Sequence, residues 1–145
     1  EIVYVDKVES IQALRMDLAI GHRVPAYCTA LGKVFLAFLP NEELDLYCQK
    51  TRFKPLTERT ITSAKELIRH LKTIREEGVA IDDREIDPGI RCIAAPIRDD
   101  SGRVVGAISI AGPTVRLTME RLKSVKAPLL EATQRISQKL GYITL

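Results

Sequence analysis

The sequence predicts an α+β fold in which helices pack on an antiparallel sheet. Three observations favour it. Short β-branched segments lie on both sides of a block with helical signals, neighbouring segments are joined by hairpin-like turns, and a long amphipathic stretch follows them. The 145 residues, 46% hydrophobic and 28% charged, are typical of one soluble globular domain, so residues 1–145 are treated as a single unit.

Two strands are expected first. Residues 2–5 are β-branched or aromatic, and residues 13–18 have the composition of a second strand that ends at Gly21. A hairpin would join them.

Two helices should follow directly. Thr29 is expected to cap a helix that runs through an apolar stretch and stops at Pro40, and Asn41 is expected to cap a short helix after it.

The third helix has the clearest local signal. Ser63 and Glu66 form a capping box, in which each side chain satisfies the other residue's free amide, and Gly78 stands where a left-handed C-terminal residue belongs. Apolar residues between these signals recur at helical spacing: Leu67, Leu71 and Ile74.

Three strands and a long helix complete the chain. Strands are expected over residues 79–82, 90–97 and 104–111, with a tight turn at residues 99–102. From Thr118 an apolar stripe predicts one helix: Leu122, Val125, Leu129, Ile136 and Leu140. Pro128 inside it is expected to kink or divide that helix. The predicted order is β, β, α, α, α, β, β, β, α.

Charge and cysteine content exclude several function classes. The 22 basic and 19 acidic residues are scattered, so this segment is not expected to bind DNA by itself. The three cysteines show no CxxC spacing, so no disulfide, metal site or cofactor is expected, and a reducing cytoplasm is the simplest compartment. The longest apolar run, residues 34–39, is too short to span a membrane. Because the chain opens inside a predicted strand without a methionine, we expect a fragment of a longer protein.

Alternation along the last two predicted strands separates two kinds of side chain. Cys92 and Ser109 share a face with small alanines, whereas isoleucines occupy the opposite face. Small residues leave room, so helices covering that face could enclose a ligand cavity with a thiol and a hydroxyl as orienting groups. Close packing of helix on sheet explains the same pattern equally well.

The first turn of the helix after Thr29 also allows two interpretations. Gly32 disfavours the helix by about 1 kcal/mol relative to alanine, which a close approach by another group would justify. Free amides in this turn form an anion site, and simple close packing is the alternative. Lys33 is expected to be a solvated helix charge.

Other candidates for chemistry are weaker. Asp82, Asp83, Glu85 and Asp87 lack the spacing of a metal-binding loop and are expected to form a solvated acidic turn, with a hydrogen-bonding role left open for Asp82. No spacing unites a cysteine, a histidine and a carboxylate for catalysis, so His22 and His70 are expected to be structural and no catalytic residue is assigned.

Four separated segments carry a family resemblance. They are residues 24–37 (VPAYCTALGKVFLA), 77–85 (EGVAIDDRE), 89–97 (GIRCIAAPI) and 106–113 (GAISIAGP). In this order they resemble the C-terminal effector-binding domain of IclR-family bacterial transcriptional regulators, over nearly the whole chain.

This resemblance implies a GAF-like domain that follows a winged helix-turn-helix DNA-binding domain absent from this chain. Its ligands would be small carboxylates such as glyoxylate, pyruvate, sugar acids or aromatic acids. The domain would associate with other copies of itself in a homodimer or homotetramer. Only the absent domain would bind DNA, and no membrane is involved. The effector-binding residues carried over are Met16, Val24, Ala30, Leu31, Asp82, Ile90, Cys92 and Ser109. Backbone amides of Ala30 and Leu31 would meet the carboxylate.

We therefore expect a non-enzymatic sensor that modulates operator binding. Two alternatives remain: a thiol-dependent enzyme using Cys92 beside Arg91, and a ligand-free oligomerisation module. Strand geometry sends Cys92 and Arg91 to opposite faces, which weakens the first.

Overall fold

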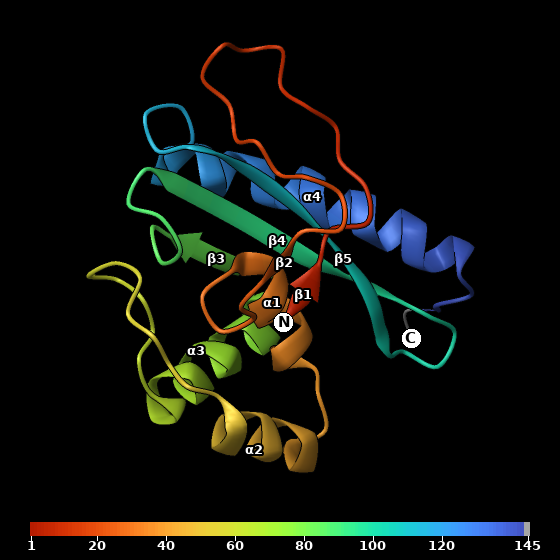
Figure 1. Cartoon of the computed structure of the whole chain (residues 1–145). Helices are drawn as coiled ribbons and strands as arrows, with labels where there is room; N and C mark the ends of the chain where they lie inside the picture. The colour runs from red at the N-terminus through yellow and green to blue at the C-terminus, as the bar shows by residue number, and fades with distance from the viewer. Residues whose placement is uncertain (144–145) are drawn as a thin grey trace.

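The computed structural model describes residues 1–143 and has the predicted α+β architecture and element order. Its elements are β1 (Ile2–Val3), β2 (Arg23–Val24), α1 (Ala30–Ala37), α2 (Asn41–Lys50), α3 (Ala64–Glu77), β3 (Ala80–Asp83), β4 (Ile90–Arg98), β5 (Val104–Pro113) and α4 (Met119–Lys139) (Figure 1).

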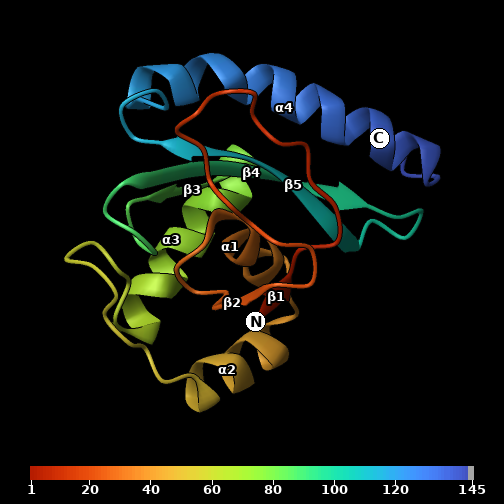
Figure 2. The same ribbon diagram turned by 45° about the horizontal axis from the view of Figure 1, so that its top comes forward.

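An antiparallel sheet in the order β3-β4-β5 forms the middle layer. Helix α4 covers one face, while α1 and α3 lie on the other and α2 lies beyond them (Figure 2). Pro96 interrupts no ladder with β3, because β3 pairs with β4 only from Arg91 to Ala94.

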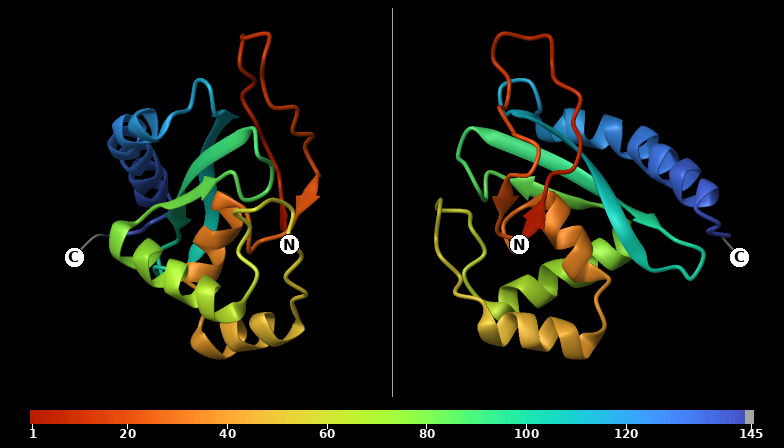
Figure 3. Two further views of the ribbon diagram at one scale, coloured as in Figure 1. Left: turned by 90° about the vertical axis from the view of Figure 1, so that its left-hand side faces the viewer. Right: turned by 45° about the vertical axis from the view of Figure 1, so that its right-hand side comes forward.

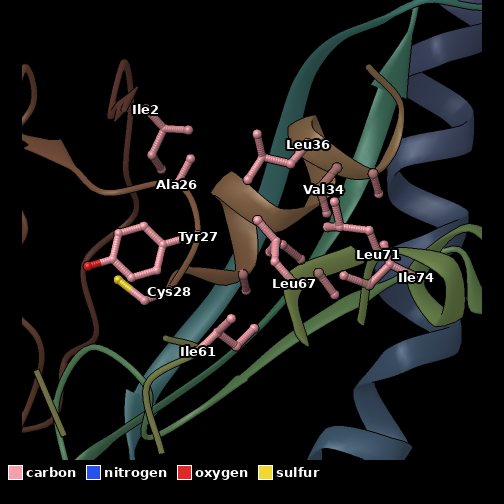
Figure 4. Close-up of a cluster of buried hydrophobic side chains, with 14 of the residues drawn as sticks. Ile2, Ala26, Tyr27, Cys28, Val34, Leu36, Ile61, Leu67, Leu71 and Ile74 are labelled. Atoms are coloured by element: carbon pink, nitrogen blue, oxygen red, sulfur yellow. The ribbon is translucent and has the colours of Figure 1, made fainter. Parts of the chain in front are cut away.

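Two buried clusters hold the layers together. The larger lies between the sheet and α1, α2 and α3, and includes Val34, Leu67 and Leu71, which meet in the interior (Figure 4). The smaller lies between the sheet and α4: Val79, Ile93, Ala95, Leu117, Leu122 and Leu129. Both sheet faces are therefore covered.

The predicted helix signals are mostly confirmed. At α3, Ser63 Oγ accepts from the amide of Glu66 at 3.2 Å, and Gly78 is left-handed with φ 74°. The Glu66 carboxylate accepts from Thr62, at 3.3 Å, instead of Ser63, so only half of the predicted capping box forms. At α2 the N-cap is Pro40, and Asn41 is the first helical residue, because proline's fixed φ suits the helix entry.

The predicted second strand over residues 13–18 is wrong. Residues 5–20 form a long loop whose far end projects from the body (Figure 3), and β1 pairs instead with β2, where Ile2 opposes Val24. A strand needs a neighbouring backbone as well as suitable residues. Ile2 and Val24 pair because both side chains enter the core.

Helix α4 is undivided, with Pro128 inside it. The predicted apolar stripe holds for its first half, where Leu122 and Leu129 are buried, but Ile136 and Leu140 are exposed. Thr133 and Ser137 are buried in their place. Ser137 Oγ accepts a hydrogen bond from the amide of Arg98, the last residue of β4, at 2.9 Å. This end of α4 therefore supplies a hydrogen-bond acceptor to the end of a strand rather than extending the apolar core.

Among residues 1–143, none of the helices combines the length and apolarity that a membrane span requires.

Candidate functional site

The start of α1 presents unused backbone donors. Thr29 has extended backbone geometry, and its Oγ1 accepts from the amide of Gly32 at 3.2 Å while donating to the carbonyl of Pro25 at 3.0 Å. The first amides of a helix have no acceptor within the helix. Gly32 is satisfied by its cap, so the amides of Ala30 and Leu31 are left for another acceptor.

Gly32 is required by packing. A Cβ at this position would lie 2.3 Å from both Cα and O of Ala26. The close-packing interpretation of Gly32 is therefore confirmed. This contact fixes the segment before α1 against the helix and so positions the free amides.

Strand register gathers the polar side chains on the face below α1. Asp82 of β3 lies opposite Cys92 of β4, and Ser109 of β5 lies opposite Ala94. Directly opposed residues of antiparallel strands point to the same face. Asp82, Cys92 and Ser109 thus form one group from three adjacent strands.

A cavity of about 220 Å³ lies between this group and the start of α1. All eight residues predicted as binding residues line it: Met16, Val24, Ala30, Leu31, Asp82, Ile90, Cys92 and Ser109. Further lining residues are Tyr4, Leu18, His22, Thr29, Ile86 and Asp87. His22 was expected only as a structural residue, and its place at the cavity follows from the pairing of β1 with β2.

A second hollow of about 340 Å³ runs along α2. It is lined by Leu39, Glu43, Leu46, Tyr47, Lys50 and Thr51 and is shallow and open. The cavity beneath α1 is the better candidate site, because it is lined by the start of a helix and by polar side chains from three strands.

A buried ion pair underlies the cavity, contrary to the sequence expectation. Lys33 is 1% exposed; its Nζ contacts the Glu85 carboxylate and donates to the carbonyl of Ile81 at 2.6 Å. Lys33 is thus not a solvated charge, nor are Asp82 and Glu85 part of a solvated turn. Lys33 is the sole charged residue in the sequence of α1, ALGKVFLA, and that isolation was the available signal.

The acidic turn divides into two environments. Asp82 and Glu85 point into the protein, and Asp82 Oδ1 accepts from the Glu85 amide at 2.7 Å. Asp83 points the other way, where it contacts Arg91 at 2.8 Å and Arg59 at 3.0 Å. Of the acidic residues in this turn, Asp82 and Asp87 line the cavity, while Glu85 pairs with Lys33 next to Asp82.

Burial controls the protonation of the cavity's acids. It raises the pKa of Asp82 to about 7, and the neighbouring Glu85 carboxylate adds to the effect, against the opposing hydrogen bond from the Glu85 amide. Burial also raises the pKa of Tyr4 to about 12 and that of the Cys92 thiol still further. Cys92 is therefore a neutral thiol at physiological pH, with little nucleophilic character.

The remaining candidates lie elsewhere. His70 is half-buried on α3, where burial lowers its pKa. Cys28 is buried in the core, and Cys48 is half-buried on α2. Within residues 1–143, no group of three or more histidine, cysteine and acidic side chains has a metal-binding arrangement.

Comparisons of this chain with known proteins all indicate the same family. Residues 1–138 match the family described as bacterial transcriptional regulator IclR C-terminal. Over 141 residues the chain is 43% identical to the HTH-type transcriptional regulator KdgR of Escherichia coli strain K12, covering 97% of this chain and 54% of KdgR. The chain spans about half the length of the curated relatives it matches.

Solved structures agree. The crystal structure of Thermotoga maritima IclR matches with a TM-score of 0.88 and 40% identity, covering 97% of this chain and 57% of that one. The inducer binding domain of a PobR double mutant from Acinetobacter, in complex with 3-hydroxybenzoic acid, matches with a TM-score of 0.75 and 28% identity, covering 86% and 72%. This chain belongs to the IclR family of bacterial transcriptional regulators and corresponds to their C-terminal, effector-binding domain.

Proposed function

We propose that this domain binds a small carboxylate metabolite in the cavity beneath α1 and thereby regulates transcription. One observation carries the proposal: Ala30 and Leu31, whose amides are free at the start of α1, line the same cavity as the side chains of Asp82, Cys92 and Ser109. Anions are favoured at such helix ends by the free N–H groups and the helix dipole. The PobR domain with 3-hydroxybenzoic acid shows a carboxylic acid bound by a domain of this fold.

Each lining residue has a role in this proposal. Ala30 and Leu31 donate backbone hydrogen bonds to the effector carboxylate. Asp82, Cys92 and Ser109 contact its other polar atoms. The apolar side is supplied by Met16, Val24 and Ile90. A volume of about 220 Å³ holds about seven groups the size of water, at ~30 Å³ each, which suits a small metabolite.

In this proposal, regulation arises because the effector binds two conformations of the protein with different affinities. An effector shifts the DNA affinity of the whole protein only by the difference in its own affinity for two conformations, typically about 1–3 kcal/mol. In this proposal the DNA is bound by a helix-turn-helix domain outside this chain, and association into a homodimer or homotetramer transmits the shift. No bond in the effector is made or broken.

The two alternatives, a thiol-dependent enzyme and a ligand-free oligomerisation module, have less support. A thiol-dependent enzyme would need an activated Cys92, but burial keeps that thiol protonated. Arg91 extends to the opposite face, where its Nη1 donates to the carbonyl of Leu117 at 2.8 Å. A domain that served only to join subunits would not need a cavity lined by free helix amides.

Calorimetric titration of this chain with pyruvate, glyoxylate, gluconate and 3-hydroxybenzoate tests the proposal. At least one should bind, and Ser109→Ala should weaken that binding. Gln49→Ala, on exposed α2, is the matched control and should not. Absence of binding by all four acids would contradict the assignment.

A further inference from the structure

Asp82 has an unused acceptor at the floor of the cavity. Its side chain is fully buried, and Oδ1 accepts from the Glu85 amide. Its Oδ2 has no hydrogen-bond partner among the described residues. A buried polar oxygen without a partner is uncommon and costly. Because Asp82 lines the cavity, a ligand there is a natural partner for it.

Beside the cavity, Asp82, Glu85 and Lys33 form a buried group of two carboxylates and one cation. Lys33 is engaged by Glu85 and by the carbonyl of Ile81, so it gives Asp82 no direct contact. Glu85 Oε2 is itself without a partner in the described structure. An effector carboxylate would be a third negative charge in this poorly solvated region. Like charges at close range disfavour the ionised form.

The elements packed around Asp82 place several titratable groups on its side of the sheet, but among the described residues Lys33 is the one buried cation there, because the buried Arg91 of β4 points to the opposite face. The titratable groups are Tyr4 just after β1, Cys28 before α1, Lys33 in α1, Glu85 in the loop after β3, and Cys92 in β4. At the cavity mouth lie His22 and Asp87, both exposed, while β5 contributes the neutral Ser109. Proton uptake is therefore the way to remove the extra negative charge at the floor.

We propose that an anionic effector binds together with one proton, which is held by the Asp82 carboxyl and lets that group donate a hydrogen bond to the effector. This inference rests on the proposed function. A carboxyl whose pKa is already raised to about 7 takes up the proton readily near neutral pH. The protonated acid must meet an acceptor, so an effector presenting oxygen at the floor is favoured over one presenting an ammonium group.

The affinity for an anionic effector should decrease as the pH rises. The bound anion raises the pKa of Asp82 further, so protons are taken up on binding wherever free Asp82 is ionised. Affinity should fall by about tenfold per pH unit above pH 7 and level off below about pH 6.

Calorimetry in two buffers of different ionisation enthalpy measures this uptake. The four acids named above are titrated at about pH 6, 7 and 8, and about one proton should be taken up per bound acid at the highest pH. Asp82→Asn should abolish the uptake and flatten the dependence of Kd on pH. Asp87→Asn is the matched control, since it neutralises an exposed acid of the same cavity, and it should retain both.

His22 supplies the competing explanation, because an imidazole at the mouth would also gain a proton beside an anion. His22→Gln should therefore retain the uptake. Loss of uptake in His22→Gln, or its persistence in Asp82→Asn, would overturn the proposal. If the Asp82 variant does not fold, the wild-type uptake and the His22 variant still decide the question.

The two proposals fail in different ways. Binding of an acid without proton uptake overturns the role of Asp82 and leaves the effector site standing. No binding at any of the three pH values overturns the effector site and this inference with it.

Discussion

On one face of the three-stranded sheet, Ile93 and Ala95 pack against Leu122 and Leu129 of α4. On the other face, the alternate residues Cys92 and Ala94 lie beneath α1, and a cavity remains beside them. Strand β4 therefore presents aliphatic side chains to α4 and the polar Cys92 to the cavity, one residue apart. The α4 face gains stability from close packing, whereas the α1 face keeps a hollow and buries the Lys33–Glu85 ion pair beside it.

The largest loss of stability should come from breaking the charge pair on the α1 face. Lys33→Met leaves the Glu85 carboxylate buried without its cation, which costs about 3–5 kcal/mol of unfolding free energy. Urea unfolding measures it. Adding Glu85→Leu should recover much of this loss. If the single variant is as stable as the wild type, pairing does not hold the α1 face together.

Truncation on the α4 face should affect stability alone. Leu122→Ala removes a fully buried side chain and should cost about 2–5 kcal/mol without changing effector affinity. Leu140→Ala, at the exposed C-cap residue that follows α4, is the control and should change stability by less than about 0.5 kcal/mol. A weaker effector affinity in folded Leu122→Ala would show that the two faces are coupled.

Stability should also depend on pH through the α1 face. Burial raises the folded-state pKa of Asp82 from 3.8 to about 7, so its contribution is fully present below pH 3.8 and is lost as pH rises through about 7. Asp82→Asn removes this loss. Relative to that variant, the wild type should lose up to about 4 kcal/mol between about pH 4 and pH 7. Parallel pH profiles from chemical denaturation of the two proteins would contradict the prediction.

The smallest expected effect is a loss of effector affinity that leaves stability unchanged. Ser109→Ala removes one hydroxyl from the cavity and should weaken effector binding by about fivefold, equivalent to about 1 kcal/mol. Its unfolding free energy should stay within about 0.5 kcal/mol of the wild type. Calorimetry and urea unfolding on the same samples separate the two quantities. A loss of stability larger than the loss of affinity would make Ser109 a packing residue.

Local signals predicted the scaffold because they act over a few residues. Thr29 caps α1 through the amide three residues later, and alternation alone placed Cys92 and Ser109 on one face. The burial of Lys33 was not predictable in this way, since its partner Glu85 lies 52 residues further along the chain. The strand expected over residues 13–18 was wrong for a similar reason: pairing depends on a partner backbone that local composition does not identify.

Met16 and Leu18 reach the cavity from the long loop between β1 and β2 instead of from the sheet or a helix. Loops accept substitution and changes of length more readily than packed elements do. Substitutions in this loop would therefore change the lining of the cavity while leaving the three-stranded sheet and both buried clusters intact.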